Sequence, residues 1–176
     1  NLDKASDRRE VAVALEQLGA RQALKMAKAG LKKEKDSDLE ASWVRAVAAC
    51  GAKDKGTRKT ILKLATGEGS TDLRASAAFA MGYLQRGDDV REVWNELLQG
   101  SSAPLRVAAA CGAALARDEL AIPGIRTALD GLTDDDVNKE SLQRTLDVLK
   151  GGDLYVIQQD VERVTKTVKG VRNDPK

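Results

Sequence analysis

The segments LRASAAFAMGYL (Leu73–Leu84) and LRVAAACGAALA (Leu105–Ala116) decide the fold. Each opens with Leu-Arg and continues with alanines at helical spacing, and alanine has the highest helix propensity of the amino acids. Related segments begin at Asp7, Leu39 and Val137, so successive starts are 32, 34, 32 and 32 residues apart. A period this regular across the chain predicts stacked repeats of one structural unit.

A second helical stretch follows each of these segments. In the stretch Asp89–Leu98, for example, Val93, Trp94 and Leu97 lie on one face at a period near 3.6. Glycines fall where the helices should end, and no segment alternates apolar and polar residues as a strand does. We therefore expect an all-α protein that forms a single domain over residues 1–176. The predicted helix pairs lie at about 5–35, 37–67, 71–100, 103–132 and 136–170, followed by a disordered tail at 171–176.

The two segments quoted above resemble the HEAT repeat in its short bacterial form, as found in phycobilisome-lyase-type proteins. The shared pattern is a polar start, Leu-Arg, spaced alanines and an Ala-Leu-Gly-like end. The resemblance extends over the whole chain and is strongest in the three middle pairs, although the Asp and Pro signals of the family's loops are mostly missing. It implies a right-handed α-α superhelix, an armadillo-like solenoid that binds partners. Tetratricopeptide repeats have a similar period, but their aromatic and proline pattern is absent here.

Few residues of the chain are suited to catalysis or metal binding. The chain has no histidine, which excludes Ser-His-Asp, Cys-His and His-metal sites. The glycine-rich segment 65–71 lacks the lysine of a phosphate-binding loop, so we interpret it as a turn. Asp134, Asp135 and Asp136 lack the ligand spacing of a calcium loop and are expected to cap a helix. We expect no catalytic residues, metal or cofactor. The resembled family includes lyases and glycosylases. An enzyme of that kind, using a groove residue such as Glu96, is therefore one alternative function.

Cysteines and aromatic residues allow further expectations. Cys50 and Cys111 lie in alanine-rich helical segments and are predicted to be buried and reduced. Trp43 is either a core residue or an exposed anchor for a partner, and so is Tyr83, whose hydroxyl near a helix end can reach water. No run approaches the ~20 apolar residues of a membrane span. The first residue is Asn rather than Met, so we expect a processed or truncated chain, either cytoplasmic or exported after loss of a signal segment.

Charge is distributed unevenly along the chain. Residues 1–88 carry 17 Lys/Arg and 12 Asp/Glu, whereas residues 89–176 carry 12 and 15. The second helices of a solenoid commonly line its concave binding face, and a surface of both signs suits a protein partner. A nucleic acid bound by the same lysines is the alternative, and lysines that only keep an alanine-rich helix soluble are the simplest interpretation. The predicted partner-binding residues are Lys25, Lys28, Lys32, Arg58, Lys59, Lys63, Glu92 and Glu96.

Overall fold

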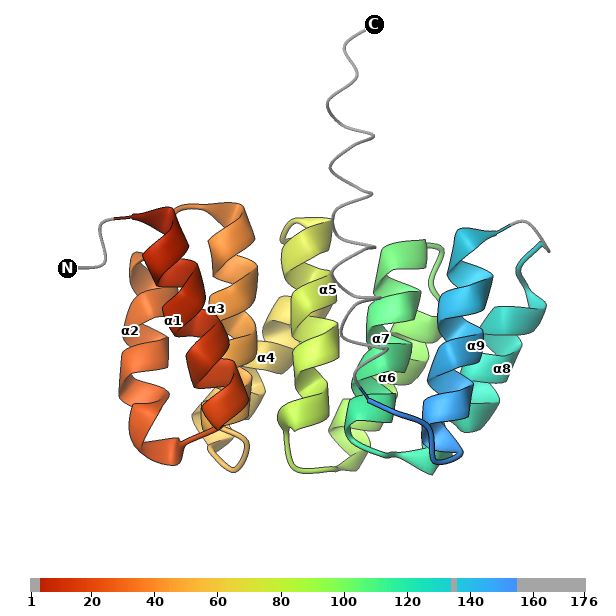
Figure 1. Cartoon of the computed structure of the whole chain (residues 1–176). Helices are drawn as coiled ribbons and strands as arrows, with labels where there is room; N and C mark the ends of the chain where they lie inside the picture. Colours follow the sequence, from red (N-terminus) through yellow and green to blue (C-terminus); the bar gives the residue numbers. More distant parts are fainter. Residues whose placement is uncertain (1–3, 134–135, 155–176) are drawn as a thin grey trace, which may run out of the picture. The chain divides into compact units, whose positions relative to one another are not determined.

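The computed structural model describes residues 4–133 and 136–154 of the 176-residue chain. Every regular element in this part is helical (Figure 1), which confirms the all-α prediction. Short 3-10 turns precede α2 and α8 and follow α5, and they are named η1 (Arg21–Ala23), η3 (Glu119–Ala121) and η2 (Met81–Tyr83). The α-helices are α1 (Ala5–Leu18), α2 (Leu24–Lys33), α3 (Ser37–Cys50), α4 (Lys55–Thr66), α5 (Thr71–Ala80), α6 (Asp88–Gln99), α7 (Ala103–Leu115), α8 (Ile122–Asp130) and α9 (Val137–Leu149).

Polar side chains fix several of the helix starts. The carboxylate of Asp36 accepts hydrogen bonds from the first backbone N–H groups of α3, and Asp54 does the same for α4. These bonds satisfy amides that have no partner inside the helix. Asp136 caps α9 as predicted, whereas Asp134 and Asp135 lie outside the described residues. The glycine-rich segment 65–71 is the predicted turn, because α4 ends at Thr66 and the cap of α5 follows.

The chain divides into two compact units, residues 1–85 and 86–176. In the first unit α1, α3 and α5 form one layer and α2 and α4 form a second layer (Figure 1). In the second unit α7 and α9 pack together, and α6 and α8 pack beside them. Within one unit, a second helix contacts the first helix of the following pair more extensively than the first helix of its own pair. The predicted helix beyond residue 154 and the tail at 171–176 lie outside the described residues.

Small residues allow the helices of the first unit to approach closely around one large side chain. Trp43 on α3 is only 2% exposed and packs with Ala12, Leu15 and Ala27, so the core interpretation of this residue is confirmed. A Cβ atom on Gly30 of α2 would lie 2.5 Å from the Trp43 ring, and the indole therefore requires glycine at this position. Cys50 and Cys111 are buried and free, as predicted.

A partly buried polar network joins α1 to later parts of the first unit. Glu16 on α1 accepts a hydrogen bond from Arg45 Nε at 3.1 Å and another from the Tyr83 hydroxyl at 2.8 Å. Burial raises the pKa of Tyr83 above its ordinary value, and the negative charge of Glu16 raises it further. The sequence predicted that the Tyr83 hydroxyl could reach water. In the structure this hydroxyl donates to Glu16 and thereby holds η2 against α1.

Candidate functional site

Three predicted contact residues lie on α2, and the structure separates them into two kinds. Lys25 and Lys32 are exposed. Lys28 is also exposed, but its Nζ atom lies 2.8 Å from Oδ1 of Asp54, the residue that caps α4. The hydrogen bond from Lys28, together with those from Thr57, lowers the pKa of Asp54 well below its ordinary value. Lys28 therefore joins α2 to the start of α4.

The other three predicted cations lie on α4 and divide in the same way. Lys59 and Lys63 are exposed, whereas Arg58 is partly buried and donates to the backbone carbonyl of Gln85. Lys55, which is not among the predicted contact residues, is the first residue of α4 and is exposed four residues before Lys59. The spacing of Lys55, Lys59 and Lys63 is i, i+4, i+8, so the three side chains form one row along the helix. That spacing alone could have revealed the row.

A basic side chain near the start of three second helices contacts a residue 26 or 27 positions later in the chain. Arg58 is the fourth residue of α4, and Arg91 is the fourth residue of α6. Arg91 Nε lies 2.7 Å from Oδ2 of Asp118, whose side chain also accepts from the N–H of Leu120 in η3. The hydrogen bond to Asp118 raises the pKa of Arg91 above its ordinary value. Lys28 with Asp54, Arg58 with Gln85 and Arg91 with Asp118 are thus three contacts at a similar sequence spacing, the first two in the first unit and the third in the second.

The predicted acidic contacts lie on α6 in the second unit. Glu92 and Glu96 are both exposed, and Trp94 between them is buried at 1% exposure. When Arg58 and Arg91 are aligned, Glu92 occupies the position of Lys59 and Glu96 that of Lys63. Asp88 likewise corresponds to Lys55. The same solvent-facing row is therefore positive on α4 and negative on α6.

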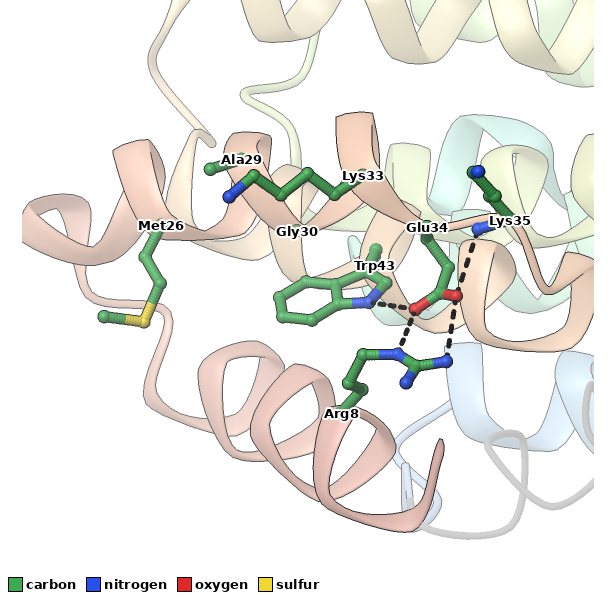
Figure 2. Close-up of a pocket in the computed structure, with 8 residues that line it drawn as sticks. All are labelled: Arg8, Met26, Ala29, Gly30, Lys33, Glu34, Lys35 and Trp43. Atoms are coloured by element: carbon green, nitrogen blue, oxygen red, sulfur yellow. Dashed lines mark hydrogen bonds and ion pairs between the residues drawn. The ribbon is translucent and has the colours of Figure 1, made fainter. Parts of the chain in front are cut away.

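A hollow of about 530 Å³ lies beside α2 in the first unit. Its volume falls within the range of small-molecule pockets. Figure 2 shows the Trp43 indole below α2, with Met26 at one end and Glu34 and Arg8 beside the indole nitrogen. Sequence reasoning did not find this hollow, because its walls come from α1, from α2 and the residues after it, and from α3. The lining residues are Arg8, Met26, Ala29, Gly30, Lys33, Glu34, Lys35 and Trp43.

Glu34 is the electrostatic centre of the hollow. Its side chain is 3% exposed and accepts from Arg8 Nε at 3.0 Å, Arg8 Nη2 at 3.3 Å and Trp43 Nε1 at 3.3 Å. The backbone N–H groups of Lys35 and Asp36 donate to it at 3.1 and 3.2 Å. Burial alone would raise the pKa of Glu34, but these hydrogen bonds lower it from 4.5 to about 2. The carboxylate is therefore charged at neutral pH and holds α1 to the end of α2.

Within residues 4–133 and 136–154, no three cysteine or carboxylate side chains are grouped so that they could hold a metal ion. None of the helices described by the structure is long and apolar enough to span a membrane. Neither a protein-family model nor a curated protein matches the chain. The comparisons therefore identify no family, and the fold stands as an all-helical one whose helices pack mostly with their near neighbours in the sequence.

Proposed function

We propose that the chain is a noncatalytic HEAT-like repeat scaffold that binds an acidic segment of a protein partner along its second helices, the face that is concave in a superhelix of such repeats. The support is a group of exposed cations on α2 and α4 that have no ion-pair partner among the described residues. These are Lys25, Lys32, Lys55, Lys59 and Lys63.

The repeat architecture is supported by contacts that recur at the repeat period. The contacts of Lys28, Arg58 and Arg91 with residues 26 or 27 positions later are one set. A second set lies in the second unit: Arg86 Nε donates to the carbonyl of Ala116 at 2.9 Å, and Arg117 Nη1 donates to that of Val148 at 2.7 Å. The donors are 31 residues apart and the acceptors 32, close to the sequence period. Contacts that recur in this way favour a stack of like helix pairs.

A row of lysines contributes more binding free energy toward an acidic segment than one lysine can. A single exposed ion pair contributes only about 0–1 kcal/mol. Lys55, Lys59 and Lys63 lie on successive turns of α4, so an acidic segment running along the helix meets all three. Glu92 and Glu96 at the equivalent positions of α6 would repel the same segment and attract a basic one. The exposed row on α4 and the equivalent row on α6 would therefore select segments of opposite charge.

The test measures fluorescence anisotropy of a labelled oligoglutamate peptide titrated with the full chain. The variant K59E/K63E should bind the peptide at least about tenfold more weakly, because two attractive contacts become repulsive. The matched control R9E/R126E makes the same change in net charge with two exposed arginines elsewhere and should bind like the parent. Equal loss in both variants, or no binding by the parent chain, would refute the proposal.

Salt dependence separates the protein partner from the nucleic-acid alternative. Single-stranded DNA bound by several lysines loses affinity linearly in log salt, with a slope of about −0.7 for each phosphate neutralised. The same titration with a labelled oligothymidylate measures that slope. Three results together would identify nucleic acid, rather than an acidic protein segment, as the ligand. The DNA binds more tightly than the peptide, the slope is about −3 or steeper, and K59E/K63E weakens DNA binding.

A further inference from the structure

The hollow beside α2 brings exposed apolar and cationic groups together in the first unit. Met26 at its edge is 58% exposed, and Trp43, Ala29 and Gly30 contribute further apolar lining. Lys33 and Lys35 at the rim are exposed and have no ion-pair partner among the described residues. The charge of Arg8 is balanced by Glu34. The chemistry that fits is a bulky apolar side chain with a carboxylate next to it.

The second unit carries such an element on its surface. Leu120 in η3 is 69% exposed, and its neighbour Glu119 is exposed as well. The turn is held in place: the Asp118 side chain accepts from the N–H of Leu120 at 3.3 Å and binds Arg91 at 2.7 Å. A large apolar side chain that is both exposed and held in a fixed turn loses little conformational freedom on binding.

We propose that two copies of the chain associate head to tail, with Leu120 of one copy in the hollow of the next and Glu119 beside Lys33 and Lys35. Charge complementarity favours this occupant, because Lys33 and Lys35 at the rim of the hollow are cationic and Glu119 beside Leu120 is acidic. The contact uses none of the lysines on α4.

The proposed contact is heterologous, since it joins two different patches rather than one patch to itself. A heterologous contact leaves a free hollow at one end of every assembly and a free Leu120 at the other, so association continues to longer chains unless a ring closes. It also predicts a specific rescue: a copy damaged only in the hollow and a copy damaged only at Leu120 can still form one contact with each other.

The experiment is sedimentation velocity of the full chain and of two variants, Met26→Asp and Leu120→Asp. Both residues are exposed, so neither change disturbs the core. The parent chain should sediment faster as its concentration rises, and less so at about 1 M salt than at about 0.1 M, because salt screens the ion pairs. Each variant alone should associate at least about tenfold more weakly. An equimolar mixture of the two should form a dimer and nothing larger.

The control is Leu18→Asp, which changes a leucine on α1 that is 71% exposed and does not line the hollow. It should associate like the parent chain. A parent chain that remains monomeric up to about 1 mM would overturn the inference, even if the hollow binds an acidic peptide from another source. Association lost equally in Leu18→Asp, or a mixture of Met26→Asp and Leu120→Asp that stays monomeric, would place the contact elsewhere and would also overturn it.

Discussion

Replacing Glu34 with glutamine tests the electrostatic account of the first unit most directly. The glutamine side chain keeps the shape of glutamate and one carbonyl oxygen, so the backbone N–H groups of Lys35 and Asp36 can still donate to it. Its amide group, however, is a donor and would face the donors of Arg8 and Trp43. The substitution therefore removes one charge and the bonds on one side of the carboxylate without leaving a cavity.

The expected cost at neutral pH follows from the pKa of Glu34. A fall from 4.5 to about 2 corresponds to about 3 kcal/mol of stabilisation without screening by solvent. Arg8 is 28% exposed, so water screens its contribution, and we expect a loss of about 2 kcal/mol from the free energy of unfolding. For a chain of this length that loss lowers the melting temperature by about 4–8 °C.

The pH dependence has a definite sign. Because folding lowers the pKa of Glu34, its stabilisation is complete above the ordinary pKa of 4.5 and is lost as the pH falls toward about 2. The difference in unfolding free energy between the parent and Glu34→Gln should therefore be constant from about pH 6 to 8 and shrink toward zero near pH 2. Other carboxylates titrate in both proteins and cancel in this difference.

Urea unfolding followed by tryptophan fluorescence measures the effect. The chain has two tryptophans, so a Trp94→Phe background leaves Trp43, which contacts Glu34, as the only reporter. The control Glu68→Gln alters an exposed carboxylate and should change stability by less than about 0.5 kcal/mol. A Glu34→Gln difference that is equally large at pH 3 and pH 7, or no larger than that of the control, would refute the reasoning.

Three further predictions concern helix contacts. Gly30→Ala should destabilise by about 1–2 kcal/mol and shift the Trp43 emission, since overpacking against the ring outweighs the gain in helix propensity; a variant as stable as the parent would contradict this close contact. Asp54→Ala should lower the melting temperature more than Lys28→Ala does, because it removes both a helix cap and the ion pair, and equal shifts would deny the cap. Asp118→Ala should lower the free energy of unfolding in urea by about 2 kcal/mol, because this side chain is 3% exposed and accepts hydrogen bonds from Arg91 and Leu120. A loss below about 0.5 kcal/mol would show that Asp118 does not hold η3 to α6.

The helices themselves were predictable from the sequence. Helix formation is local, since each backbone N–H bonds four residues back, and the alanine segments with their polar starts and glycine ends show that pattern directly. Segments predicted to begin at Leu39, Leu73 and Leu105 lie in α3, α5 and α7. The burial of Cys50 and Cys111 also followed from the small residues around them, whereas the sequence left Trp43 as either a core residue or an exposed anchor.

The functional surface was only partly predictable. Sequence spacing placed Lys25, Lys28 and Lys32 on one helix face, and the composition of that segment showed it to be basic. It could not show that Lys28 contacts Asp54, 26 residues away, or that Arg58 contacts Gln85, 27 residues away. Which of the cations remain available to a partner is decided by these distant contacts.

The sequence by itself determined that this protein is built of helices, how often they recur and where its positive charge is concentrated, because those properties depend on residues within a few turns of one another. Only the tertiary structure decided which lysines are engaged inside the first unit, and only it formed the hollow. Arg8, Glu34 and Trp43 come together there because α1 and α2 both pack on α3, and no local pattern in the sequence encodes a site built by three helices.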